Sequence, residues 1–261
     1  MPNCRKICIK ARPNDSGRDK ARNAKEMIDM SDYQTGVLLV HGIQGSPKQL
    51  HFLTEALPRN TIVSNLLLPG HGAGVSQFRH SGQEQWLLAV VDAALKLRIK
   101  CSKVIFVGHS MGCLLGLLAE KENPGLFSDM ILLCCPFSLH LTFRYLKNNI
   151  LSFKKDPSDP YVLATKEANS VSAKNPLAYF FCVHPYLELL RMIHSVGRMK
   201  LPSVSVKYFF ADHDEIVSPH SVAIADAHKT NSTHILTDCG HHYFTDEAKK
   251  KIKDVLLTSC T

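Results

Sequence analysis

Five short apolar runs recur along the chain, and longer stretches with a helical pattern separate them. The runs are rich in β-branched residues and span residues 37–40, 62–68, 104–107, 130–134 and 204–210. Parallel strands need long crossover connections, so strands that alternate with helices predict a parallel sheet with helices on both faces. The fold class predicted from the sequence is therefore α/β, with a mostly parallel central sheet.

One interval between two of these runs is too long for a simple crossover. Residues 137–201 contain helical pieces, a polar KKDPSDP loop and the patch PLAYFFCVHPYLELL. We expect this interval to form a helical cap inserted after the strand that ends near Cys135. The core would then consist of residues 1–136 and 202–261, with at most one short edge strand near Ile7–Ile9 in the first 30 residues.

Cysteine and histidine usage argues against a disulfide framework or a metal centre. The nine cysteines are odd in number and scattered, and the chain has no C-x-x-C pair. This pattern is typical of reduced thiols, and it predicts a cytoplasmic protein. The 14 histidines include no H-E-x-x-H spacing, so we expect no bound metal.

Charge and hydropathy exclude two further classes of partner. The formal charge is +8, but lysines and arginines are spread from end to end, which does not favour nucleic acid binding. The apolar runs are shorter than the roughly 18–20 residues that span a bilayer, and the polar, basic start lacks a signal-peptide apolar region. We expect no stable membrane insertion, no export by a signal peptide, and a monomer or homodimer.

The turn after the third apolar run carries a serine between two glycines. Gly108-His109-Ser110-Met111-Gly112 follows VIFV and precedes CLLGLLAE. A G-x-S-x-G sequence on a strand-to-helix turn is a nucleophile elbow, in which the glycines let the two arms approach without a Cβ clash. Ser110 is therefore the candidate nucleophile.

A serine nucleophile needs a histidine base and an acid, which follow it in the order acid, then histidine. The segment VSVKYFFADHDEIVSPHS supplies two aspartates, Asp212 and Asp214, where a strand ends. The segment ILTDCGHHYFTDEAKK supplies two histidines, His241 and His242, before the last helix. The pattern alone leaves both choices open.

Five motifs in this order resemble the α/β-hydrolase superfamily, and most closely its bacterial carboxylesterase and monoacylglycerol lipase branch. The motifs are VLLVHGIQGSPKQL, LLLPGHGAG, VGHSMG, ADHDEIVSP and GHHYF. The resemblance covers residues 36–135 and 203–258, and the cap resembles that branch only in position. It implies an α/β-hydrolase fold.

The resemblance also implies roles for single residues. The acid would be Asp214, with Asp212 as the alternative, and the base would be His241. His242 would face away from the site and pack against Tyr243 or a surface helix.

An oxyanion hole would complete such a site. In this fold its two donors are the backbone amide after the nucleophile and an amide in the loop after an early strand. These would be the amides of Met111 and Ile43. His109 would point into the scaffold or the pocket wall, and His71 would serve a turn.

The implied activity is that of a serine hydrolase that cleaves carboxylic esters, as a carboxylesterase or monoacylglycerol lipase does, through an acyl-enzyme on Ser110 and without a cofactor. The substrate would be a small acyl ester held under the cap. The expected acyl-binding wall consists of Leu177, Tyr179, Phe180, Phe181 and Leu187. Thioesterases, acyltransferases and lysophospholipases use the same triad, and a hydrolase-fold receptor with little turnover is a further alternative.

Overall fold

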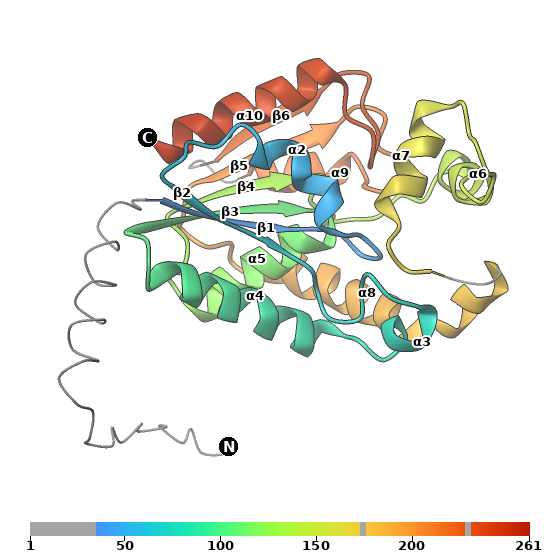
Figure 1. Cartoon of the computed structure of the whole chain (residues 1–261), viewed down its shortest axis with the longest axis horizontal. Helices are drawn as coiled ribbons and strands as arrows, with labels where there is room; N and C mark the ends of the chain where they lie inside the picture. The colour runs from blue at the N-terminus through green and yellow to red at the C-terminus, as the bar shows by residue number, and fades with distance from the viewer. Residues whose placement is uncertain (1–34, 173–175, 228–230) are drawn as a thin grey trace, which may run out of the picture. The chain divides into compact units, whose positions relative to one another are not determined.

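The computed structural model describes residues 35–172, 176–227 and 231–261, and they contain a six-stranded, wholly parallel sheet (Figure 1). The strand order is β2-β1-β3-β4-β5-β6. This confirms the predicted α/β class and the parallel sheet; the edge strand expected near Ile7–Ile9 lies outside the described residues. The strands are β1 (Thr35–Val40), β2 (Thr61–Leu66), β3 (Lys103–His109), β4 (Asp129–Leu133), β5 (Val206–Ala211) and β6 (Ser232–Leu236).

The strand order reverses at β1, and this reversal places the site. The chain runs from β1 out to the edge strand β2, then crosses back over β1 to β3 and continues through β4 to β6. In an open parallel sheet, the connections on either side of such a reversal leave on opposite faces and open a crevice at the carboxyl ends of the strands. The loops that follow β1 and β3 meet at this crevice.

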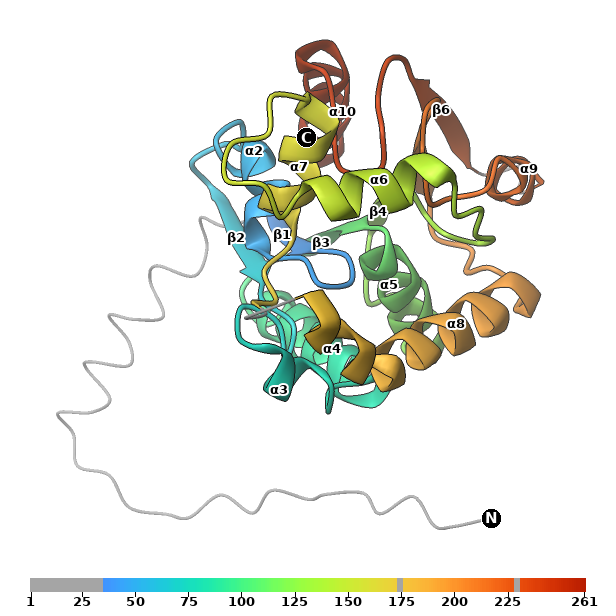
Figure 2. The ribbon, with the colours of Figure 1, turned by 90° about the vertical axis from the view of Figure 1, so that its right-hand side faces the viewer.

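Helices cover both faces of the sheet and the carboxyl ends of its strands. Figure 2 shows α4, α5 and α8 on one face, α2 and α10 on the other, and α6 and α7 across the strand ends. The helices are η2 (Pro47–Leu50), α2 (His51–Thr54), α3 (Val75–Phe78), α4 (Gln83–Arg98), α5 (Met111–Glu122), α6 (Phe143–Leu151), α7 (Pro160–Ala168), η3 (Pro176–Phe181), α8 (Val183–Arg198), α9 (His220–Asp226) and α10 (Asp246–Cys260).

The proposed cap interval divides into parts that pack differently. Helix α8 lies against α5 and α4, and its Met192 and Val196 belong to the main hydrophobic core. Helices α6 and α7 lie against each other, and α7 also contacts η2 beside the site. The division into a core and a cap at residues 137–201 stays a prediction.

The apolar stripe of α4 shows where periodicity is informative and where it is ambiguous. The apolar spacing of residues 86, 87, 90, 91, 94 and 95 predicts one buried face, and Trp86, Val90 and Ala94 are buried. Leu95, however, is 50% exposed, and Leu97 is buried in its place. The helix turns Leu95 out because residues 86, 90, 94 and 97 already form one continuous face.

Close backbone contact surrounds the two glycines of the elbow. A Cβ placed on Gly112 would lie 2.3 Å from the carbonyl oxygen of Val40, and one on Gly108 would lie 2.8 Å from the carbonyl carbon of Gly112. Real Cβ atoms essentially never come this close to a neighbour, and the atoms in the way are mostly backbone, with the ring of Phe106 equally near Gly108. The start of α5 can therefore pack against β1 only where side chains are missing.

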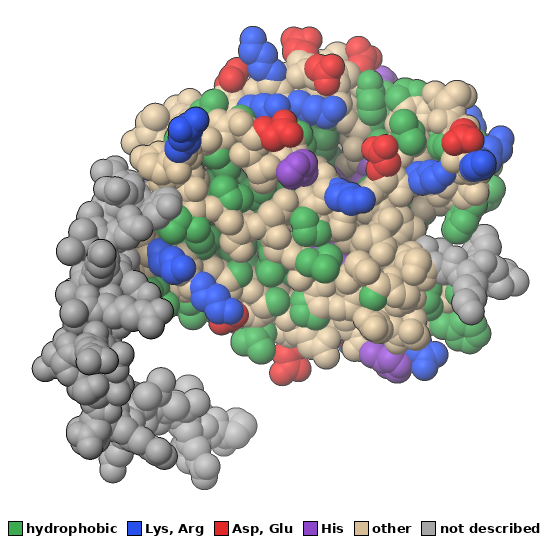
Figure 3. Space-filling model, in the orientation of Figure 1, with side chains coloured by type: hydrophobic (Ala, Val, Ile, Leu, Met, Phe, Trp, Pro, Cys, Tyr) green, Lys and Arg blue, Asp and Glu red, His purple; other side chains and the backbone are tan. Residues whose placement is uncertain are grey.

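The surface and the thiols have ordinary features. Lys and Arg are interspersed with Asp and Glu on the face that Figure 3 shows. Within the described ranges, no helix combines the length and apolarity needed to cross a bilayer. The cysteines in those ranges are all free thiols, and most are buried.

Replacing Gly112 with Ala should destabilise the fold by about 1–3 kcal/mol or more, because the new methyl group overlaps the Val40 carbonyl. Gly197→Ala in α8 is the matched control: its Cβ would meet only the Phe137 carbonyl oxygen at 3.7 Å, so helix propensity should leave it neutral or stabilised by up to about 1 kcal/mol. Urea denaturation measures both variants. Equal stabilities would contradict the packing argument.

Candidate active site

Ser110 lies at the point where β3 passes into α5, in an unusual backbone conformation. Its φ of 52° and ψ of −119° are rarely adopted by residues other than glycine. The backbone N–H of Ser110 donates to the carbonyl of Leu133 at 2.9 Å, which ties the elbow to the end of β4. The strain is thus held by close packing on one side and by a hydrogen bond on the other.

The structure brings the side chains of Ser110, His241 and Asp214 into one hydrogen-bonded line. The Ser110 hydroxyl donates to Nε2 of His241 at 3.0 Å. Nδ1–H of His241 donates to the Asp214 carboxylate, with 3.1 Å to Oδ1 and 3.0 Å to Oδ2. All three side chains are buried, and this is the arrangement that deprotonates a serine hydroxyl. Their catalytic roles stay a prediction.

Asp214 is held as a carboxylate by donors on every side. Besides His241, the amides of Ile216 and Val217 donate to its Oδ1 at 2.9 and 2.8 Å. Burial by itself raises the pKa of Asp214, but the charge and hydrogen bond of His241 and the two amides outweigh it, so the pKa is lowered. The acid therefore stays ionised beside the imidazole.

The pKa of His241 is raised above its ordinary value of 6.5. Burial lowers the pKa of this imidazole, but the adjacent Asp214 and the charge of Glu215 together raise it further. The raised pKa makes the imidazole a stronger base than usual, which favours transfer of the serine proton to it.

Asp212, the alternative acid, binds backbone amides of another loop and not the imidazole. Its carboxylate accepts the backbone N–H groups of Asp238 and Cys239, at 3.0 and 3.1 Å. The side chain is 27% exposed. Asp212 therefore fixes the loop that leads to His241, while Asp214 contacts the imidazole itself.

The loop after β1 lies directly against the nucleophile. A Cβ on Gly42 would lie 3.1 Å from Cβ of Ser110, which is tighter than most real Cβ contacts, so the loop approaches the nucleophile closely. Ile43 follows Gly42, and Met111 opens α5, where the first amides of a helix have no intrahelical acceptor. The amides of Ile43 and Met111 as oxyanion donors stay a prediction.

Glu215 is a buried charge that sequence reasoning missed. Its side chain is 3% exposed, and its Oε2 accepts the backbone N–H of His241 at 3.0 Å. Its Oε1 accepts from Asn148 of α6 at 3.4 Å, and its carbonyl accepts from Thr142. Glu215 thus joins the acid loop, the base loop and α6. The sequence signal is weak, because a glutamate beside an aspartate after a strand usually faces solvent.

Two further histidines, His109 and His242, lie near His241, and one of them differs from expectation. His109 does point into the scaffold: its Nε2 donates to the carbonyl of His241 at 2.8 Å, and burial lowers its pKa to about 3. The expectation that His242 faces away from the site is wrong. Its ring lies 4.8 Å from that of His241 and 5.7 Å from that of His109, because the base loop turns back towards η2.

His71 packs among aromatic rings in the second glycine turn. Its ring centroid lies 4.8 Å from that of His41, 5.0 Å from that of Phe78 and 5.8 Å from that of Trp86. Gly70 and Gly72 flank it with φ values of 80° and 72°. The expected structural role agrees with this packing.

The predicted acyl-binding wall lies on η3 and the start of α8. Phe180 is 75% exposed, Phe181 68% and Leu187 45%. The side chains of Leu177 and Tyr179 lie outside the described part of the chain. The role of these five residues stays a prediction.

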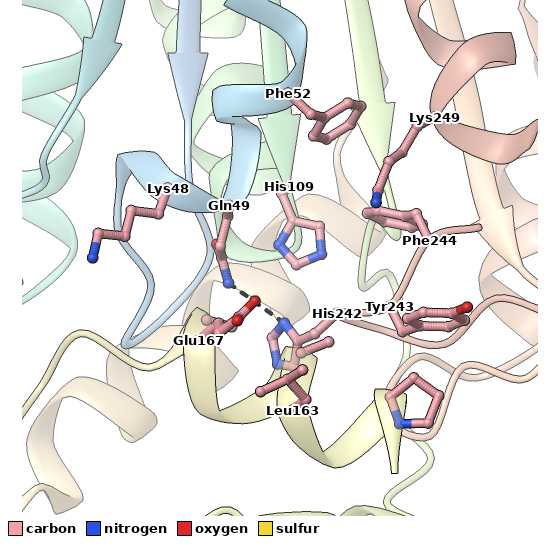
Figure 4. A pocket seen from close by; sticks show the side chains of 13 residues that line it. Lys48, Gln49, Phe52, His109, Leu163, Glu167, His242, Tyr243, Phe244 and Lys249 are labelled. Carbon is pink, nitrogen blue, oxygen red and sulfur yellow. Dashed lines mark hydrogen bonds between the residues drawn. The ribbon is translucent and has the colours of Figure 1, made fainter. Parts of the chain in front are cut away.

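A cavity of about 520 Å³ lies beside the base loop, and residues of α7 form one of its walls (Figure 4). Gln49 and His242 form another part of the wall, and His109 reaches it from the elbow. Sequence reasoning did not identify α7 as a lining element. The full lining is Lys48, Gln49, Phe52, His109, Pro160, Leu163, Ala164, Glu167, Ala168, His242, Tyr243, Phe244 and Lys249.

A sequence profile described as "Alpha/beta hydrolase family" matches residues 37–254. The match covers most of the chain, and it spans the elbow and the loops that carry Asp214 and His241. The chain therefore belongs to the alpha/beta hydrolase family.

Relatives and solved structures agree with this assignment. The chain is 31% identical over 90 residues to a thermostable monoacylglycerol lipase of Bacillus sp. (strain H-257), and this match covers 34% of the chain and 36% of that lipase. The chain thus matches only about a third of the length of this curated relative.

Two solved structures share the fold at low sequence identity. One, described with LipS and LipT, two metagenome-derived lipolytic enzymes, has a TM-score of 0.63 at 20% identity and covers 88% of this chain and 94% of that one. A monoacylglycerol lipase of Paleococcus ferrophilus has a TM-score of 0.58 at 16% identity, with coverage of 87% and 96%.

Replacing Glu215 with Gln should lower the pKa of His241, because it removes a negative charge that raises that pKa while keeping an oxygen for the His241 amide. Titration of the imidazole by NMR measures the shift. Glu122→Gln, an exposed residue at the end of α5, is the charge-matched control and should leave the titration unchanged. An unchanged His241 pKa in Glu215→Gln would contradict the electrostatic role.

Proposed function

We propose that this chain is a serine hydrolase that cleaves carboxylic esters through an acyl-enzyme on Ser110. The observation that carries the proposal is the hydrogen-bonded line from Ser110 through His241 to Asp214, on an elbow beside two candidate oxyanion amides. Every part of that line is buried, so its electrostatic interactions are little screened by water.

In the acylation step, Oγ of Ser110 attacks the ester carbonyl while Nε2 of His241 takes the hydroxyl proton. The carbonyl oxygen becomes an oxyanion, which the amides of Ile43 and Met111 stabilise. His241 then gives the proton to the leaving alcohol as the C–O bond breaks. Asp214 keeps the proton of neutral His241 on Nδ1 and stabilises the imidazolium.

In the deacylation step, water takes the place of the alcohol. His241 removes a proton from the water, the hydroxide adds to the acyl carbonyl, and the same amides hold the second oxyanion. The bond to Oγ breaks, the proton returns to Ser110, and a carboxylic acid leaves. The two steps together consume one ester and one water, and they require only side chains of this chain.

An apolar acyl ester is the substrate class that the surroundings support best. The named relatives are lipases, and α6 presents apolar side chains near the strand ends, with Phe143 82%, Leu146 53% and Ile150 61% exposed. The same proposal includes a cytoplasmic location, a cap formed by residues 137–201, and a monomer or homodimer. Thioester hydrolysis, lysophospholipid hydrolysis and ligand binding without turnover are outcomes that the assays below distinguish.

Ser110→Ala should reduce hydrolysis of p-nitrophenyl butyrate by about a million-fold, because the acyl-enzyme cannot form. The assay compares wild type and variant across p-nitrophenyl esters and monoacylglycerols of increasing chain length, with an acyl-thioester and a lysophospholipid as further substrates. Thermal unfolding checks that the variant is folded. A variant that keeps a tenth of the wild-type rate, or a wild type inactive on every substrate, would refute the proposal.

Asp214→Asn should reduce kcat by about 10⁴-fold, because an amide cannot hold His241 in the tautomer that accepts from Ser110. Asp212→Asn is the matched comparison, one residue of the same type two positions away. It keeps an oxygen for one of the two loop amides, so its loss should be at most about tenfold. Equal losses in kcat would contradict the assignment of Asp214 as the acid.

A further inference from the structure

We propose that Gln49 is a positioning residue that holds the oxyanion loop (residues 41–45) in register with the base loop (residues 239–243). The two ends of its side-chain amide connect the two loops. This inference rests on the proposed function, because it concerns the same site. The sequence motifs assign no role to Gln49.

The Gln49 side chain makes two hydrogen bonds of opposite sense. Its Oε1 accepts the backbone N–H of Gly42 at 3.1 Å, and its Nε2 donates to Nδ1 of His242 at 3.4 Å. Figure 4 shows Gln49 and His242 facing each other in the cavity wall. The orientation of the amide is fixed by chemistry, because a backbone N–H can only donate.

At the first loop, Gln49 completes the immobilisation of Gly42. The carbonyl of Gly42 accepts from Nδ1–H of His41 at 2.8 Å and from the N–H of Gly45 at 3.0 Å. In a trans peptide the N–H of Ile43 is antiparallel to that carbonyl, so fixing the carbonyl also fixes the direction of the proposed oxyanion donor. Gln49 holds the preceding N–H and so secures Gly42 from its other side.

At the second loop, Gln49 fixes the residue next to the base. The ring of His242 lies against that of His241, with 4.8 Å between centroids and an interplanar angle of 80°. Burial, together with His241 and His109, lowers the pKa of His242 well below its ordinary value. The neutral ring offers the Nδ1 lone pair to Gln49 and carries its proton on Nε2.

The local packing is shaped around this amide. A Cβ on Gly45 would lie 2.5 Å from Oε1 of Gln49, so glycine at that position leaves room for the amide oxygen. Glutamate at position 49 offers only acceptors, and methionine offers neither an amide donor nor a strong acceptor. A primary amide is the side chain that accepts from Gly42 and donates to a neutral Nδ1 at once.

Gln49 does not touch the reacting atoms, so it acts through the position of the proposed oxyanion donor. An oxyanion donor acts on charge that exists only during reaction, and a displaced donor lowers kcat more than it changes KM. A misplacement of about 1 Å in such a site reduces the rate by up to about 100-fold.

The experiment compares Gln49→Met and Gln49→Glu with Gln77→Met, which replaces an exposed glutamine of α3. With p-nitrophenyl butyrate, Gln49→Met should lower kcat by about 10–100-fold while KM stays within about threefold, and Gln77→Met should match wild type. Gln49→Glu keeps an acceptor for Gly42 and should recover part of kcat. A kcat for Gln49→Met within about twofold of the control, or a loss confined to KM, would overturn the proposal.

The tautomer of His242 gives a readout that does not depend on turnover. In wild type, ¹⁵N NMR should find Nδ1 unprotonated; in Gln49→Glu the carboxylate can only accept, so the proton should move to Nδ1. The same tautomer in both proteins would overturn the proposal. If wild type hydrolyses none of the esters while the tautomer switches, the proposed function fails and the amide bridge stands.

Discussion

The contact between the start of α5 and the end of β1 is the constraint on which the site depends. Gly112 packs so closely on the carbonyl of Val40 that a single methyl group would overlap it. This contact fixes the first turn of α5 beside the loop after β1, and so sets the spacing between the amides of Met111 and Ile43. It also holds Ser110 at a φ of 52°, with its hydroxyl directed to His241.

Around this fixed point, buried polar groups from distant parts of the chain converge. Asp214 accepts from His241 and from two amides of its own loop, and Glu215 accepts from the backbone of His241 and from Asn148 of α6. His109 donates to the carbonyl of His241. His241 is therefore held through its ring, its backbone N–H and its backbone carbonyl. This limits the motion of the imidazole and keeps it in place for proton transfer.

The sequence predicts the parts of this arrangement that local patterns encode. The apolar runs indicate the strands because β1, β3, β4 and β5 are almost wholly buried, whereas the edge strand β2 is only half-buried. The glycines of the elbow are required by close packing of the backbone. The choice between Asp212 and Asp214 came from the family resemblance, and the geometry places only Asp214 against the imidazole. Glu215, Gln49 and His242 could not be predicted, because their burial depends on loops that meet across 26 to 193 residues of chain. Leu95 of α4 shows the same limit within a single helix, where periodicity predicts Leu95 on the buried face and the structure buries Leu97 there.

The central claim is that Ser110 is a nucleophile activated by His241. Intact-mass and peptide analysis after treatment with a fluorophosphonate tests it most directly, since the reagent phosphonylates only an activated serine. The account predicts one adduct, on the peptide that contains Ser110, forming more slowly as the pH falls through the raised pKa of His241. No adduct, or an adduct on another residue, would contradict it.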